Sequence, residues 1–219
     1  MRPLIFAGIV LMVVGVVWGL VVAPPEAFQG TPQRIMYVHV PSVIAAYAAL
    51  IVTAASSALF LWRRDARWDR VAQGSAELGV LFLSMTLLSG AIWGRPVWGT
   101  WWAWDARLST TLILWFIYVG YLIVRAWAPG ARGARAAAVL GIIGVLDIPI
   151  IHWSVEFLRT LHPQATVLRP GGQGLPRSML IPLAVNNLAF VALYASLLVL
   201  RVRQERALGA LVERLEREP

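Results

Sequence analysis

The amino-acid sequence predicts an all-α, polytopic integral membrane protein with six transmembrane helices and both termini in the cytoplasm. The first supporting observation is composition: 59% of the 219 residues are hydrophobic and only 14% are charged, whereas soluble domains contain about 25% charged residues. The second is the recurrence of apolar runs that approach the roughly 20 residues an α-helix needs to cross a bilayer. The third is the distribution of arginine, which sets the orientation.

Six apolar segments are the candidate spans. They cover residues 4–23, 35–62, 71–93, 108–124, 136–151 and 179–200. The first is expected to be a retained helix, because its apolar run exceeds that of a signal peptide and Pro24–Pro25 makes a poor cleavage site. Polar residues interrupt the third and fifth segments, and Asp147 precedes Pro149 in the fifth. Since a proline ring disrupts the preceding helical turn, we expect a kink there.

All 19 basic residues are arginine, and their positions favour one topology. With the N-terminus inside, thirteen arginines fall on the cytoplasmic side and six on the outer side, which agrees with the positive-inside rule. The outer segments are then about 24–34, 94–107 and 152–178. Residues 1–200 form the expected membrane domain, with an outer loop at 93–110. Residues 201–219, with leucines at helical spacing, are expected to form a cytoplasmic amphipathic tail.

Charge and cysteine content restrict the possible partners and chemistry. The sequence pI of about 11.1 is explained by arginines at helix ends that meet lipid headgroups. Membrane lipid is therefore an expected partner and nucleic acid is not. The chain contains no cysteine, which excludes disulfides, thiolate chemistry and cysteine-ligated metal.

The segment WGRPVWGTWWAWDARLST, residues 93–110, holds five of the eleven tryptophans. An aromatic belt at the membrane interface is one interpretation, because tryptophan favours that position. The clustering favours another: a platform on which a large flat apolar ligand stacks. The residues expected to form it are Trp98, Trp101, Trp102 and Trp104. Arg95 and Arg107 flank these rings and would pair with carboxylates on the ligand, while Asp105 would order the loop.

A flat apolar ligand with carboxylates fits the description of haem, whose iron is most often held by histidine. All three histidines lie at or near the predicted outer surface. His39 and His162 come from different outer segments and are the expected axial ligands; His152 is not expected to bind iron. For each histidine the alternative is a polar residue at the interface. Zinc is disfavoured, because structural zinc sites use closely spaced Cys and His ligands.

The sequence WGTWWAWDARLST resembles the WWD signature, W-G-x-x-W-x-W-D-x-R-L-T, of the haem-handling proteins of cytochrome c maturation. Ser109 or Thr110 supplies the final hydroxyl. The chain length, the six spans and the segments YVHVPS and SVEFLRTLHP narrow the resemblance to the haem exporter protein C (CcmC) family of maturation system I. The resemblance covers residues 4–200. The segment EFLRTLH departs from it, because more tryptophan is expected before His162.

The resemblance implies a protein of the cytoplasmic (inner) membrane that binds haem b on the periplasmic side. Such a protein presents haem to the chaperone CcmE and works with the ATPase CcmA, the membrane subunit CcmB and the small protein CcmD. By position, His39 and His162 match the family's axial ligands, and the tryptophan loop matches its haem platform and chaperone-docking segment. The chain itself has no nucleotide-binding motif, so ATP hydrolysis is expected from a partner. The expected role is that of a haem-delivery membrane subunit and not of an enzyme.

Two other functions remain open at the level of the sequence. A permease subunit for a small hydrophobic solute would use Asp147, Asn186 and Asn187, since polar residues within spans are candidate functional groups. The same residues would also serve as helix–helix hydrogen bonds. A b-type redox cytochrome would need histidines near both faces of the membrane, and no histidine lies near the inner face.

Overall fold

The computed structural model describes residues 2–162 and 174–215 of the chain. Within these residues the regular elements are helices and no strand is present, which confirms the all-α prediction. In chain order they are α1 (Arg2–Val17), η1 (Trp18–Val22), η2 (Thr31–Ile35), α2 (Met36–Arg63), α3 (Ala66–Trp98), α4 (Ala106–Trp127), α5 (Ala131–Val145), α6 (Asp147–Phe157) and α7 (Arg177–Leu215).

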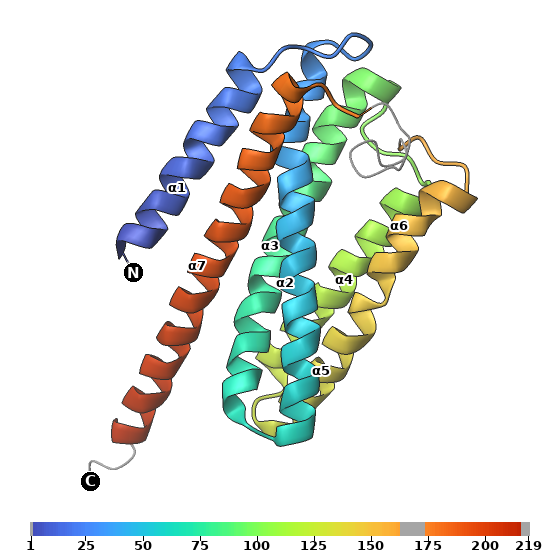
Figure 1. Cartoon of the computed structure of the whole chain (residues 1–219). Helices are drawn as coiled ribbons and strands as arrows, with labels where there is room; N and C mark the ends of the chain where they lie inside the picture. The colour runs from blue at the N-terminus through green and yellow to red at the C-terminus, as the bar shows by residue number, and fades with distance from the viewer. Residues whose placement is uncertain (1, 163–173, 216–219) are drawn as a thin grey trace.

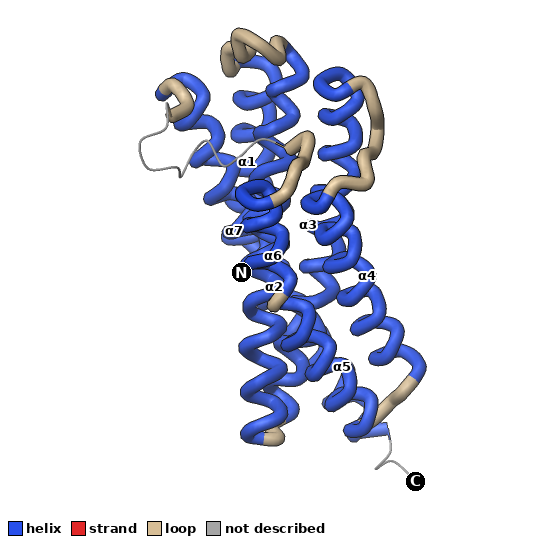
Figure 2. The backbone as a smooth tube through the Cα atoms, turned by 90° about the vertical axis from the view of Figure 1, so that its right-hand side faces the viewer, coloured by secondary structure: helices blue, strands red, loops and turns tan. Residues whose placement is uncertain are grey.

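The helices form one elongated bundle in which α2 and α3 are central (Figure 1). On one side α7 packs against both central helices, and α1 packs mainly against α7. On the other side α4 contacts α3, α5 contacts α2 and α4, and α6 contacts α4. The same arrangement is visible from the side in Figure 2. Small buried residues on α2, namely Ala45, Ala46 and Ala49, allow this close helix packing.

Five helical stretches are long and apolar enough to cross a membrane. They are Thr31–Arg63, Ala66–Trp98, Ala106–Trp127, Ala131–Phe157 and Arg177–Leu211. The stretch Phe6–Val22 is apolar but shorter. In Figure 1, α1 begins about halfway along the bundle, and α7 ends at the lower end. The count of six and the cytoplasmic location of the termini stay predictions.

Helix α3 is longer than the predicted third span, because capping residues rather than apolar residues determine its ends. Asp65 caps its start: Oδ1 accepts a hydrogen bond from the Arg67 N–H at 2.8 Å. The Arg67 side chain also bonds to Asp65 and lowers the pKa of its carboxyl. Gly99, with φ of 77°, ends the helix in the left-handed region that favours glycine. Of the tryptophan segment at 93–110, only residues 99–105 are therefore outside helices.

The fifth predicted span is divided into α5 and α6 at Leu146, close to the expected kink. The cause is Pro149, which has no N–H to donate to the carbonyl of Val145, four residues earlier. The N–H of Leu146 instead bonds to the carbonyl of Ile143, at 3.1 Å. The break turns α6 so that it lies along the half of α4 nearest the tryptophan loop (Figure 1).

Glu77, the charged residue inside the predicted third span, is paired with a residue of another helix. Glu77 accepts two hydrogen bonds from the guanidinium of Arg201 on α7, at 2.5 and 2.9 Å. Arg125 on α4 donates to Asp69 at 2.9 Å and to Gln73 at 2.6 Å. These contacts give Asp69, Gln73 and Glu77 of α3 charged partners, as polar side chains within a span require.

Asn186 has a structural role between α7 and α1. Its buried Nδ2 donates to the carbonyl oxygens of Gly15 on α1 and Pro182 on α7, at 2.8 and 2.9 Å. This contact is the helix–helix hydrogen bond considered for the residue from sequence. It joins the first helix to the last one.

Helix α7 continues without a break past Leu200 as far as Leu215. The division at residue 200 between membrane domain and tail therefore does not coincide with a helix end, and it stays a prediction. Residues 216–219 of the expected tail, and residues 163–173 of the third outer segment with Arg169, lie outside the described residues.

Gly144 controls how closely α5 approaches α4. A Cβ at this position would lie 2.7 Å from Cε2 of buried Tyr118 and 2.9 Å from Cγ2 of Ile117. Gly144→Ala is therefore expected to lower the free energy of unfolding by about 1–3 kcal/mol, the usual effect of overpacking. Gly120→Ala is the matched control, because no atom lies within 4 Å of its added Cβ. Thermal unfolding in detergent measures both; equal stability of Gly144→Ala and wild type would contradict the packing.

Candidate functional site

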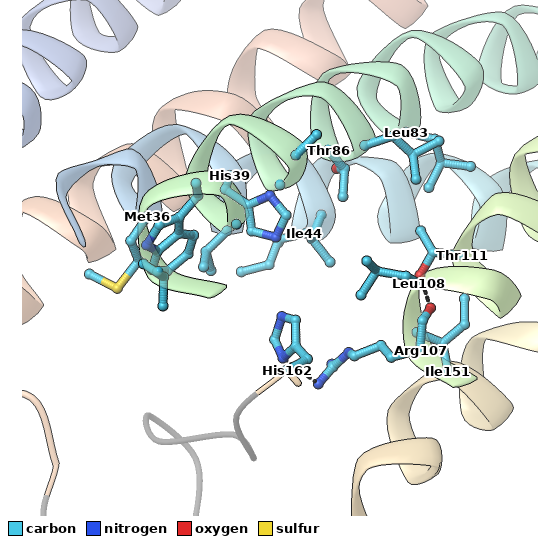
Figure 3. A pocket seen from close by; sticks show the side chains of 18 of the residues that line it. Met36, His39, Ile44, Leu83, Thr86, Arg107, Leu108, Thr111, Ile151 and His162 are labelled. Carbon is cyan, nitrogen blue, oxygen red and sulfur yellow. Dashed lines mark hydrogen bonds between the residues drawn. The ribbon is translucent and has the colours of Figure 1, made fainter. Parts of the chain in front are cut away.

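A cavity of about 460 Å³ lies in the half of the bundle that contains the tryptophan loop. Its size is within the roughly 300–1,000 Å³ of ligand and cofactor sites. Helices α2, α3, α4, α6 and α7 contribute to its wall, together with the segment that follows α6. Most of the wall is apolar, with Val40, Ile44, Leu83, Leu108 and Leu183 among the lining residues. Figure 3 shows that the polar groups are few and that two of them are histidines.

His39 enters the cavity from the first turn of α2. Its Nδ1 lies 3.1 Å from Oγ of Ser89 on α3. The Ser89 hydroxyl in turn donates to the carbonyl of Met85 at 2.6 Å, so the serine oxygen accepts from Nδ1–H. Trp93 makes an edge-to-face contact with the imidazole, with 5.7 Å between ring centroids. Gly90 leaves room for the ring, because a Cβ there would lie 3.1 Å from Cε1 of His39.

His162 reaches the cavity from the irregular segment after α6. Its backbone N–H donates to Thr160 Oγ1 at 2.9 Å, and the preceding N–H, of Leu161, donates to Asp105 Oδ2 at 3.0 Å. The ring lies in edge contact with Trp98, 6.3 Å between centroids. Nδ1 of His162 is 3.2 Å from the guanidinium of Arg107. The backbone around this histidine is thus held by Thr160 and by Asp105, and its side chain contacts Arg107. Asp105 and Arg107 belong to the WWD segment, residues 98–110.

The two histidines point toward one another across the cavity, from opposite walls (Figure 3). The sequence predicted this pair as axial ligands from separate outer segments; the structure brings the side chains together, and iron binding by them stays a prediction. His152, by contrast, is exposed on α6 and is not among the lining residues.

The four predicted platform tryptophans divide into two pairs. Trp98 and Trp102 line the cavity. Trp101 and Trp104 do not line it and are 59% and 79% exposed. The buried indole N–H of Trp102 has no hydrogen-bond partner within the described part of the chain. Since a buried tryptophan N–H usually has a partner, this donor is available to a ligand in the cavity.

The two flanking arginines also differ. Arg107 lies in the first turn of α4 and lines the cavity. Arg95 is exposed, does not line the cavity, and donates to the carbonyl of Gly99 at the end of α3. Asp105 also lies outside the cavity wall, where it caps α4 by accepting the Leu108 N–H at 2.9 Å.

Several cavity residues were not singled out from the sequence. Ser89 and Trp93 contact His39, while Tyr47 and Thr86 line the wall. One signal was present: Gly90 and Gly94, spaced by four residues, lie on one face of a helix. Their small size gives space to His39 and Trp98, because a Cβ on Gly94 would lie 2.9 Å from Cε3 of Trp98.

Comparison with known proteins agrees with these features. The profile of a protein family described as Heme exporter protein C, CcmC, matches residues 1–214. A Heme exporter protein C of Haemophilus influenzae is 42% identical over 205 residues, covering 91% of this chain and 82% of the relative. That of Escherichia coli K12 is 38% identical over 204 residues, covering 91% and 81%.

A plant relative extends the similarity to organelles. The putative cytochrome c biosynthesis ccmC-like mitochondrial protein of Marchantia polymorpha is 37% identical over 183 residues, covering 84% of this chain and 78% of the relative. With a family match along nearly the whole length and a multi-helix apolar bundle, this chain belongs to the CcmC family of haem-handling membrane proteins in cytochrome c maturation.

Proposed function

We propose that this protein binds haem b as its cargo, between His39 and His162, and presents it to the haem chaperone CcmE. The observation that carries the proposal is the pair of imidazoles facing each other across an apolar cavity (Figure 3). Histidine is the commonest axial ligand of haem iron. A porphyrin between the rings would have aliphatic side chains and the indoles of Trp98 and Trp102 around it.

The cavity also offers partners for the carboxylates of haem. Arg107 supplies a cationic guanidinium in the wall, and Trp102 supplies an unpartnered buried N–H. Charge-assisted hydrogen bonds between arginine and carboxylate are among the strongest in proteins. Arg95 is less suited to this role, because its guanidinium bonds to the chain outside the cavity.

Presentation to a partner requires that part of the cargo site remain accessible. Trp101 and Trp104 are exposed beside the cavity, and Trp104 contacts the cavity-lining Trp102 with 5.6 Å between ring centroids. We assign the inner pair of rings, Trp98 and Trp102, to holding haem. The exposed pair forms the docking surface for CcmE, since exposed tryptophan is a frequent centre of protein interfaces.

The protein acts in this proposal as a subunit of the inner membrane and not as an enzyme. The cavity faces the periplasm, as the arginine distribution predicts. CcmA supplies ATP hydrolysis, and CcmB and CcmD complete the membrane complex with this chain. A permease has less support, because the Asn186 Nδ2 donates to the backbone of Gly15 in the α1–α7 contact. A transmembrane b-type cytochrome has less support, because both cavity histidines belong to one site.

The first test addresses iron ligation. His39→Ala and His162→Ala are each expected to convert six-coordinate haem into a five-coordinate form, because each removes one axial nitrogen. His152→Ala is the matched control and should leave the spectrum unchanged, since His152 lies outside the cavity. Haem content and absorbance of the purified proteins measure the effect. Normal six-coordinate haem in His39→Ala, or loss of haem only in His152→Ala, would overturn the assignment.

The second test addresses the exposed tryptophans. The double variant Trp101→Ala, Trp104→Ala should bind haem but transfer it to purified CcmE about thirtyfold more slowly, since each of the two aromatic contacts contributes about 1 kcal/mol. The control is Trp62→Ala, Trp127→Ala, which removes two rings that are 76% and 86% exposed at the other end of the bundle. If the first variant transfers haem at the wild-type rate, these rings are only an interfacial belt.

The third test addresses Asp105 as an organiser of the loop. In Asp105→Asn one carboxylate oxygen is replaced by an NH2 group, which cannot accept the hydrogen bond from the Leu161 N–H. Loss of one hydrogen bond is expected to speed haem dissociation about fivefold without changing the axial ligands. Asp65→Asn changes the corresponding cap of α3, at the opposite end of the bundle, and should have no effect on haem. A changed axial coordination in a folded Asp105→Asn protein would contradict this role.

A further inference from the structure

Nδ1 is a hydrogen-bond donor in one of the two cavity histidines and an acceptor in the other. Nδ1 of His39 faces a hydroxyl oxygen, and Nδ1 of His162 faces a guanidinium. The difference matters because a neutral imidazole carries one proton, and only the nitrogen without it has a lone pair for a metal. The partner at Nδ1 therefore determines whether Nε2 is able to bind iron.

His39 is in the ligating tautomer. Ser89 directs its hydroxyl hydrogen to the carbonyl of Met85 at 2.6 Å, with the carbonyl of Thr86 at 3.2 Å as a second acceptor. The serine oxygen is then left to accept from His39, so the imidazole proton is on Nδ1. Nε2 keeps its lone pair. A hydrogen bond of this kind from the distal nitrogen also fixes the ring orientation of metal-binding histidines.

His162 is in the other tautomer. A guanidinium has donors only and cannot lose its charge in a protein. Nδ1 of His162, 3.2 Å from Arg107, must therefore be the acceptor, and the ring proton is on Nε2. In this arrangement neither nitrogen offers a lone pair to iron: one carries hydrogen and the other accepts from Arg107.

We propose that Arg107 masks His162: its hydrogen bond to Nδ1 keeps the ring proton on Nε2, which then cannot bind iron. A carboxylate of the incoming ligand removes this mask by taking over the hydrogen bonds of Arg107. This inference rests on the proposed function, in which haem is the ligand. The carboxylate draws the guanidinium away from the imidazole, because an arginine–carboxylate hydrogen bond is stronger than one to a neutral acceptor. Arg107 is thus a positioning residue that couples recognition of the ligand's carboxylate to iron binding by His162.

The exchange conserves charge and protons. The Arg107–Nδ1 hydrogen bond breaks and an Arg107–carboxylate hydrogen bond forms. The imidazole releases the Nε2 proton to water and takes up a proton from water at Nδ1, so the ring stays neutral. The freed lone pair of Nε2 forms the bond to iron. His39 needs no such change, so it is the first ligand and His162 the second.

Haem dimethyl ester, in which both carboxylates are methylated, separates this mechanism from simple haem binding. At saturating ligand, wild-type full-length protein should give a bis-histidine low-spin spectrum with haem. With the ester, the bis-histidine fraction should fall about tenfold and a five-coordinate species should dominate. In Arg107→Leu the ester should restore the bis-histidine spectrum, because the mask is gone. Arg159→Leu, which removes an exposed arginine outside the cavity, should behave as wild type.

The possible failures are distinguishable. A full bis-histidine spectrum of the ester in wild type would overturn the mask and leave the proposed function standing. So would a five-coordinate ester complex in an Arg107→Leu protein that still binds haem through both histidines. If Arg107→Leu does not fold, Arg107→Gln provides the same comparison, because a neutral amide donates a weaker hydrogen bond to Nδ1 of His162 than a charged guanidinium does. Absence of any haem or ester spectrum in wild type would overturn the proposed function itself.

Discussion

The hydrogen bonds of the Asp105 carboxylate are the interaction on which the cavity end of the bundle depends. One oxygen caps α4 through the Leu108 N–H, and the other holds the Leu161 N–H. The first contact fixes where α4 begins and so where Arg107 enters the cavity. The second fixes the segment that carries His162. A single side chain thereby connects two segments that are distant in the sequence, and Arg107 adds a second link through Nδ1 of His162.

At the same end of the bundle, the tryptophan side chains divide between the cavity and the exposed surface. Because α3 continues to Trp98 before Gly99 reverses the chain, the tryptophan segment is divided between a helix end and a short loop. Neighbouring rings in this loop then face different surroundings, with Trp102 lining the cavity and Trp101 exposed. The tryptophan segment thus supplies both part of the apolar cavity wall and an accessible surface. The proposed transfer of haem requires both.

The sequence predicted the helical class, the apolar stretches and the kink at Pro149, because these depend on composition and local rules. It also predicted the pairing of His39 with His162, through resemblance to a family motif. It did not predict that α3 extends over residues 66–98, since caps such as Asp65 act on ends that hydropathy does not mark. Nor did it separate Arg107 from Arg95 or find Ser89. Those distinctions depend on which way a side chain points after helices pack, and a single sequence carries little information about that.

A haem carrier differs from a haem enzyme in that its ligation must be reversible, and the two histidines differ in a way that suits this need. His39 is on a long helix, with Ser89 and Trp93 of α3 against its ring. His162 is outside any helix, held by hydrogen bonds from its turn and from the WWD segment. Segments held by few hydrogen bonds open at lower free energy than packed helices. In the proposed function the His162 side therefore opens first on release, and Arg107 returns to Nδ1 when the cargo's carboxylate leaves. Delivery then reverses binding, with His39 as the last ligand in contact with the iron.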